Sequence, residues 1–235
     1  MRIVLSALAI LAATAATAAP AGAATRNFGV SGFDRVRVDG PFKVRLATGV
    51  APFAVATGGS AAALDPVVIE VQGRTLVVRT NRSSWGGYPG VASGPVEISI
   101  GTHDLSAAWL NGSGSLAIDK ARGLSFDLSV QGAGSASIAA VAVDHLKVAV
   151  SGTASASLAG TAPRLTAIVR GISTLDAEGL VTRDATIGAD GPATVRVTVT
   201  NGAKIDAHGT ATIGLAGRPA CTVKASGSAS VSGCR

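Results

Sequence analysis

Three residues with the chemistry of a serine hydrolase stand at a regular spacing in this chain. Asp190, His208 and Ser226 each directly precede a glycine, and consecutive members are 18 residues apart. If such residues lie on adjacent strands, with backbones about 4.8 Å apart, they have the order of an acid, a base and a nucleophile for ester hydrolysis. No oxyanion-hole motif accompanies them. Polar side chains are also expected wherever a strand turns into water, so these residue types alone do not define a site.

A pair of acids suggests a second chemistry, the cleavage of polysaccharides. Asp176 and Glu178 share one face of a strand because side chains alternate with a period of two. A glycosidase needs two carboxyl groups about 5 to 9.5 Å apart, and this spacing is compatible with that. The spacing is common, however, and no aromatic residue nearby offers a platform for a sugar ring. Solvated surface acids are therefore the preferred interpretation.

Four cations near the N-terminus form the favoured candidate for a binding surface. They are Arg35, Arg37, Lys43 and Arg45. If Asp39-Gly40-Pro41 is a hairpin turn, Arg35 faces Arg45 and Arg37 faces Lys43, which costs stability. An anionic partner, such as an acidic envelope glycan or a lipopolysaccharide phosphate, would relieve that repulsion. The alternative is a solvated face that nearby acids and salt ions neutralise.

Metal, cofactor and nucleic-acid chemistry have little support in this sequence. His103, His145 and His208 lie in different registers and lack clustered partners, so we predict no metal and no cofactor. The net charge of +6 is divided evenly, with 8 basic and 5 acidic residues in 26–100 and 11 and 9 in 101–235. A nucleic-acid binder concentrates its basic residues on one surface and adds aromatic residues for stacking, whereas aromatics here are 3%.

A repeat organises the second half of the chain and would bring these residues together. It is marked by Gly112, Gly132, Gly152, Gly171, Gly191, Gly209 and Gly227, in steps of 20, 20, 19, 20, 18 and 18 residues. A period of this length is typical of a solenoid. The side chains between the glycines alternate apolar and polar, which is strand periodicity.

The alternation predicts which side chains face the interior. One inward column runs through Leu146, Val148, Val150; Leu165, Ala167, Val169; Ala185, Ile187, Ala189; Ala203, Ile205, Ala207; and Cys221, Val223, Ala225. We therefore predict an all-β fold, a parallel β-helix with about 18 to 20 residues per coil. Glycine at each corner supplies a positive φ.

Residues 25–100 lack this glycine register and are predicted to form a β-meander that caps the solenoid or merges into it. The expected strands are 33–38, 42–46, 53–57, 67–71, 75–79 and 96–100. The segment 81–95, rich in glycine and serine, is a predicted flexible loop.

The first residues of the chain predict export, and the cysteines near its end predict a disulfide. Residues 1–24 combine Arg2, an apolar core and a small-residue end, the pattern of a secretory signal peptide. No later segment reaches the roughly 20 consecutive apolar residues of a membrane span. Cys221 and Cys234, the only cysteines, are expected to form a disulfide in an oxidising compartment.

Several motifs in order resemble a known family. They are "FDRVRVDGPFKVRLATG" (33–49), "QGRTLVVRT" (72–80), "VEISI" (96–100) and "LNGSGSLAI" (110–118). Together they resemble the putative auto-transporter adhesin, head GIN domain family. The resemblance implies a right-handed β-helix made of 25–100 and 101–235, exported in bacteria, with an adhesin-like role and no agreed catalytic residues.

The function expected from these observations is a non-enzymatic binding or structural module of the bacterial envelope or surface. Its expected partner is an anionic envelope glycan, lipopolysaccharide or a surface protein, and self-association through exposed coils stays open. The alternative is an envelope hydrolase that uses the paired acids or the Ser/His/Asp column.

Overall fold

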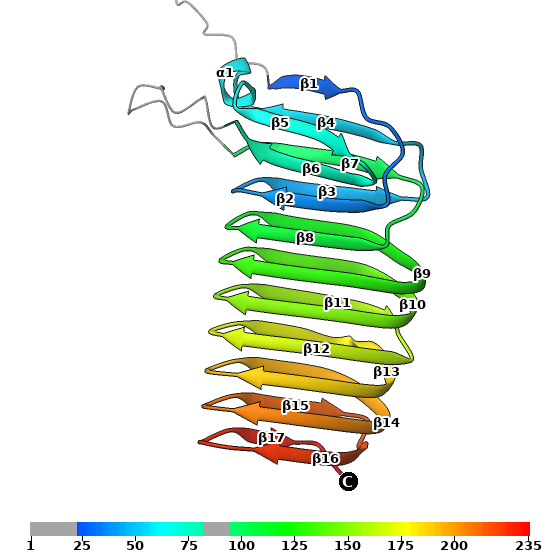
Figure 1. Ribbon diagram of the computed structural model, residues 1–235, viewed down its shortest axis with the longest axis vertical. Coiled ribbons are helices and arrows are strands. Elements are labelled where there is room, and N and C mark those ends of the chain that lie inside the picture. The colour runs from blue at the N-terminus through cyan, green and yellow to red at the C-terminus, as the bar shows by residue number, and fades with distance from the viewer. Residues whose placement is uncertain (1–22, 82–94) are drawn as a thin grey trace, which may run out of the picture.

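The computed structural model describes residues 23–81 and 95–235, so most of the predicted signal peptide and most of the predicted 81–95 loop lie outside the described residues. The described chain is a β-solenoid of about 6 turns, which confirms the predicted fold class. Figure 1 shows a straight rod of stacked coils, with the first strands at one end and the C-terminus at the other.

Long parallel strands build the regular part of the rod. They are β8 (Ala107–Gly112), β9 (Ser115–Gly132), β10 (Ser135–Gly152), β11 (Ser155–Thr161), β12 (Arg164–Gly171), β13 (Thr174–Asp190), β14 (Thr194–His208), β15 (Thr212–Ala216), β16 (Ala220–Ala225) and β17 (Ser230–Ser232). Leu146 pairs with Leu165, and Leu165 pairs with Ala185. The predicted inward columns are therefore real, and their side chains are buried from β8 to β14.

The corner glycines are confirmed by their backbone geometry. All seven predicted corners have positive φ, for example +96° at Gly152. They also stack closely, because a Cβ on Gly152 would lie 2.4 Å from the carbonyl oxygen of Gly132. Glycine is thus required at the corner both by the backbone conformation and by the close approach of successive coils.

The N-terminal strands continue the same two sheets. They are β1 (Ala24–Phe28), β2 (Arg35–Asp39), β3 (Lys43–Thr48), β4 (Phe53–Gly58), β5 (Val67–Gln72), β6 (Thr75–Thr80) and β7 (Glu97–Thr102). Strand β2 lies between β6 and β8, and β3 lies between β7 and β9, all in parallel. The β2–β3 coil is therefore inserted between two coils that follow it in sequence.

The predicted hairpin between β2 and β3 is wrong. Both edges of each strand are already paired with other strands, so β2 and β3 lie in the two opposite sheets of one coil. Gly40, with φ of +131°, is a corner glycine that stacks on Gly112. An Asp-Gly pair suits a hairpin turn and a solenoid corner equally well, so the sequence alone does not distinguish the two.

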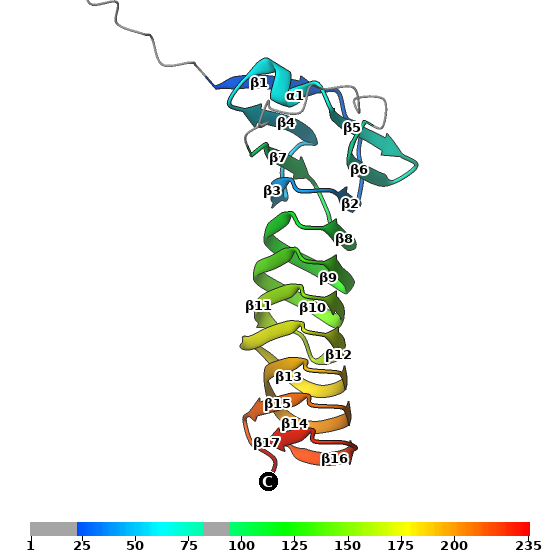
Figure 2. The ribbon, with the colours of Figure 1, turned by 90° about the vertical axis from the view of Figure 1, so that its left-hand side faces the viewer.

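The first end of the rod is covered by antiparallel strands and a short helix. Strand β4 pairs antiparallel with β7 and with β1, and β5 pairs antiparallel with β6. Helix α1 (Ala61–Leu64) begins after Ser60, whose side chain accepts a hydrogen bond from the N–H of Ala63. Figure 2 shows the β5–β6 hairpin projecting from the side of the rod, beyond the plane of β2 and β8.

The last coil differs from the expected pattern. Val223 is 41% exposed, Ala225 is exposed and Cys221 is only partly buried, because β16 pairs on one edge alone within the described chain. The predicted disulfide is confirmed: Cys221 in β16 and Cys234 after β17 are bonded, with Cα atoms 5.8 Å apart. It joins the two sides of the coil that has the fewest strand contacts.

Candidate functional site

The four predicted binding cations do not form one cluster. Arg35 and Arg37 point out from one sheet, and Lys43 and Arg45 point out from the opposite sheet, because β2 and β3 are the two sides of one coil. The prediction of one like-charged, cross-strand surface is therefore wrong. A binding role for each residue stays a prediction.

Three of these cations have carboxylate partners. Arg37 Nε lies 2.9 Å from Asp39 Oδ2. On the other sheet, Glu97 Oε1 lies 2.9 Å from Arg45 Nε, and Glu97 Oε2 lies 3.7 Å from Lys43 Nζ. The repulsion that would have favoured an anionic partner is thus largely relieved on the Lys43 and Arg45 side.

The predicted column of serine, histidine and aspartate is confirmed for His208 and Ser226, which contact each other. His208 Nδ1 lies 2.6 Å from Ser226 Oγ, as a nucleophile and base would. The acid is different from the predicted one, because His208 Nε2 lies 2.9 Å from Asp206 Oδ1. Asp190 is the in-register strand neighbour of His208, yet Asp206, two residues away on the same face of β14, supplies the carboxylate. All of this lies on an exposed face of the rod.

The paired acids do not face each other across a cleft. Asp176 accepts a hydrogen bond from the backbone N–H of Glu178 at 3.3 Å, and Glu178 Oε1 lies 3.9 Å from Arg196 Nε. Each carboxylate is thus turned to its own local partner. This arrangement fits surface acids better than the two opposed groups of a glycosidase.

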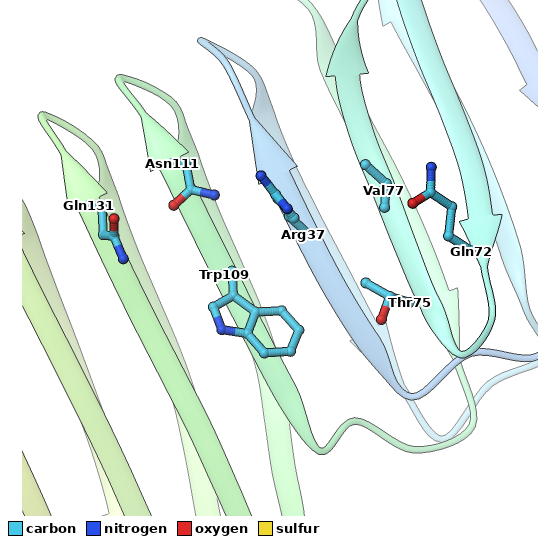
Figure 3. A pocket seen from close by; sticks show the side chains of 7 residues that line it. All are labelled: Arg37, Gln72, Thr75, Val77, Trp109, Asn111 and Gln131. Carbon is cyan, nitrogen blue, oxygen red and sulfur yellow. The ribbon is translucent and has the colours of Figure 1, made fainter.

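A hollow on the outer face of the first sheet gathers side chains suited to binding. We name it the Trp109 hollow. It encloses about 520 Å³ and is lined by Arg37, Gln72, Thr75, Val77, Trp109, Asn111 and Gln131. Figure 3 shows these side chains coming from neighbouring strands, with the flat indole of Trp109 beside Arg37. It combines an aromatic surface, amides and one cation, which are groups that can contact a polar ligand.

The Trp109 hollow lies beside the β5–β6 hairpin, which is joined to the sheet through β6 and projects from the side of the rod. Gln72 and Thr75 lie at the turn of this hairpin and are paired with each other. The floor comes from β2 and β8, in which Arg37 and Trp109 are strand neighbours. Strands β6, β2, β8 and β9 follow one another at about 4.8 Å, so the hollow extends about 14 Å along the rod.

Hydrogen bonds hold several lining groups in place. Asp39 Oδ1 accepts from Arg37 Nε at 3.1 Å and from Asn111 Nδ2 at 2.7 Å. On the hairpin, Glu70 Oε1 accepts from Gln72 Nε2 at 2.8 Å and from Arg79 Nη2 at 3.1 Å. These bonds, with that from Arg79 first, lower the pKa of Glu70. The carboxylate therefore stays charged and keeps Gln72 oriented under mildly acidic conditions.

Sequence reasoning identified Arg37 but missed Trp109 and the three amides. One signal was available: Trp109 lies between Ala108 and Leu110, which face inward, so strand alternation places the indole outside. An outward tryptophan in a chain with only 3% aromatics is unusual. The β5–β6 hairpin forms one side of the hollow, and the sequence gives no comparable signal for its position.

A second hollow, mostly apolar, lies on the opposite sheet. It encloses about 460 Å³ beside Phe53, and its lining includes Arg45, Ala47, Ala117 and Ala139. Phe53 is 39% exposed and lies over Gly101, where a Cβ would approach its ring to 2.3 Å. Both hollows thus lie near the covered end of the rod.

Residues 23–81 and 95–235 contain neither a candidate metal centre nor a candidate membrane-spanning helix. Within these ranges no group of three or more His, Cys, Asp or Glu side chains could hold a metal ion. The same ranges contain no helix with the length and hydropathy of a membrane span.

Comparison with known proteins identifies the family. The model of the family described as putative auto-transporter adhesin, head GIN domain, matches residues 32–219. The chain belongs to this family. The matched segment of the head GIN domain contains the whole lining of the Trp109 hollow, whereas Ser226 lies beyond it. No curated protein matches the chain in sequence.

Solved structures share the architecture of this head GIN domain. A putative adhesin from Bacteroides fragilis has a TM-score of 0.77 at 16% identity, covering 89% of this chain and 96% of that chain. A putative lipid binding protein from Parabacteroides distasonis has a TM-score of 0.70 at 20% identity, covering 89% and 95%. A putative adhesin from Parabacteroides merdae has a TM-score of 0.67 at 15% identity, covering 89% and 95%. At these identities the likeness shows the fold alone.

Proposed function

We propose that this head GIN domain protein is an exported, non-enzymatic, adhesin-like module that binds an oligosaccharide of the cell envelope or cell surface in the Trp109 hollow. The observation that carries the proposal is the indole of Trp109, which lies on an outer sheet face among amide side chains. The family description and the neighbours described as adhesins support an adhesin-like role.

The chemistry of the hollow suits a sugar. A pyranose ring has apolar C–H faces that pack on a flat aromatic surface, and its hydroxyl groups need donors and acceptors at the edge. The amides of Asn111, Gln131 and Gln72 offer both kinds of group. With a length of about 14 Å along the stacked strands, the hollow accommodates more than one sugar ring.

The predicted test is a titration of the protein with envelope oligosaccharides, followed by isothermal calorimetry on the best ligand. Trp109→Ala is expected to weaken binding at least about tenfold, or about 1.4 kcal/mol, because it removes the stacking surface. Ile168→Ala is the matched control, since Ile168 is 43% exposed and lies in the same outward column, three strands along. Equal binding by both variants and the unmodified protein would refute the site. If the protein binds lipid and no oligosaccharide, the apolar hollow beside Phe53 becomes the favoured site.

A second candidate function, ester hydrolysis, is favoured by one observation, the 2.6 Å contact between Ser226 Oγ and His208 Nδ1. In this reaction Ser226 Oγ bonds to the ester carbonyl carbon while its proton passes to His208. The bond to the alcohol then breaks, the alcohol takes that proton, and water releases the acid from the serine. Asp206 would orient the histidine and stabilise its positive charge.

This candidate predicts covalent labelling of Ser226 by a fluorophosphonate probe, read by mass spectrometry of the labelled peptide. Ser226→Ala is expected to abolish labelling and Asp206→Asn to slow it about tenfold or more, whereas Asp190→Asn serves as the unaffected control. The absence of labelling in the unmodified protein, at probe concentrations that label a known serine hydrolase, would exclude the hydrolase.

A further inference from the structure

We infer that the Trp109 hollow binds acidic sugars in preference to neutral ones, and that the guanidinium of Arg37 binds their carboxylate. The inference rests on the proposed function and names the class of its ligand. Among the described residues that line the hollow, Arg37 is the only charged one. The other lining groups are neutral amides, a hydroxyl, a valine and the indole, so a charged ligand group has one place to bind.

The orientation of Arg37 leaves its binding edge available. Its Nε donates a hydrogen bond to Asp39, and Asp39 also accepts a hydrogen bond from Asn111. In the described part of the chain Asp39 is the sole partner of Arg37, so the two Nη groups keep their donors. A guanidinium held in this way offers a pair of parallel N–H groups, which matches the two oxygens of a carboxylate.

The charges around the hollow are mostly paired with one another. Eight ionised side chains lie on or beside this part of the first sheet: Arg35, Arg37, Arg74, Arg79, Asp34, Asp39, Glu70 and Asp127. Four are positive and four are negative, and three of the arginines have ion pairs: Arg37 with Asp39, Arg74 with Asp34 and Arg79 with Glu70. Arg35, on the same strand as Arg37, has neither an ion pair nor a hydrogen bond to a side chain within residues 23–81 and 95–235. The surroundings of the hollow are therefore close to neutral, and a preference for an acidic ligand has to come from direct contact with Arg37.

The register places the two recognition groups one strand apart. Arg37 pairs with Trp109 across β2 and β8, so their backbones lie about 4.8 Å apart. A uronic acid ring that packs on the indole then carries its exocyclic carboxylate toward the neighbouring strand, where Arg37 stands. Figure 3 shows Arg37 and Trp109 on the same face of neighbouring strands, with the guanidinium nearer to Asn111 and the indole further along its strand.

The test uses pairs of oligosaccharides that differ only in the carboxyl group: a panel of uronate-containing oligosaccharides and their carboxyl-reduced, neutral counterparts. The unmodified protein is expected to bind at least one uronate about tenfold or more tightly than its reduced partner. Arg37→Gln is expected to bring this ratio close to one. Arg35→Gln is the matched control, because it removes an equal charge from the same strand outside the hollow, and it should keep the ratio.

The possible outcomes separate the inference from the proposed function. If Trp109→Ala lowers binding of both members of a pair while Arg37→Gln keeps the preference for the acid, the hollow binds sugar but Arg37 does not read the carboxylate. If the unmodified protein prefers a sulphated or phosphorylated sugar to every uronate, the carboxylate assignment is wrong. If it binds no oligosaccharide of either kind, the proposed function itself fails. Unchanged thermal unfolding of both arginine variants confirms that the fold is intact.

Discussion

Gly152→Ala is expected to destabilise the solenoid by about 4 kcal/mol or more, which is a large share of the 5 to 15 kcal/mol of a typical domain. Gly152 has φ of +96°, a conformation that costs a residue with a side chain about 1 to 3 kcal/mol. The new methyl group would also lie 2.4 Å from the carbonyl oxygen of Gly132, so neighbouring coils would have to move apart. Thermal or urea unfolding measures the loss.

Two other glycines separate the backbone cost from the stacking cost. Gly49 has φ of +77° but nothing within 4 Å of a Cβ, so Gly49→Ala is expected to cost about 1 to 2 kcal/mol. Gly188 has neither a positive φ nor a close neighbour, its nearest atom being 4.0 Å away, and Gly188→Ala should change stability by less than about 1 kcal/mol. If Gly152→Ala lowers the free energy of unfolding by no more than Gly49→Ala does, close stacking of the corners is not the reason that glycine is required there.

Removing the disulfide is expected to have the second largest effect. The Cys221→Ser, Cys234→Ser double variant opens a cross-link between residues 13 apart, which stabilises by about 3 kcal/mol in the chain-entropy model. The loss should be local, because each coil of a solenoid contacts only its neighbours. Hydrogen exchange is expected to accelerate in β16 and β17, whereas β9 and β10 keep their protection.

The single-cysteine variants test whether the cross-link or the side chains matter. Cys221→Ser and Cys234→Ser alone should each reproduce the accelerated exchange, since either one removes the bond. Treatment of the unmodified protein with a reducing agent should do the same. If exchange rises equally along the whole rod, the last coil is coupled to the others more strongly than this account allows.

Much of the fold could be predicted because its causes are local and repeated. The alternation around Leu146, Val148 and Val150 recurs every 18 to 20 residues, and stacked coils bury equivalent positions, so one correct coil predicts its neighbours. The corner glycines could be predicted for the same reason, because the close approach of the neighbouring coil requires glycine at each corner. The disulfide followed from having only two cysteines in a chain predicted to be exported.

The candidate site could be predicted only in fragments. Arg37 was selected for a reason that the structure overturns, the supposed hairpin with β3. His208 and Ser226 were correctly placed beside each other because strand register is regular. Asp206 was missed, since the choice between Asp190 and Asp206 depends on side-chain direction, which the repeat does not specify.

The sequence alone therefore determined the strands, the spacing of the coils, the inward faces and the corners, because these depend on neighbours one repeat away. Only the tertiary structure decided where the β2–β3 coil is inserted. The two edges of this coil could pair with any suitable strand. In the folded protein β2 pairs with β6 and β8, and β3 pairs with β7 and β9. The same insertion sets Arg37 beside Trp109 and leaves the β5–β6 hairpin projecting over them. The Trp109 hollow is thus a product of non-local strand pairing, which no local pattern encodes.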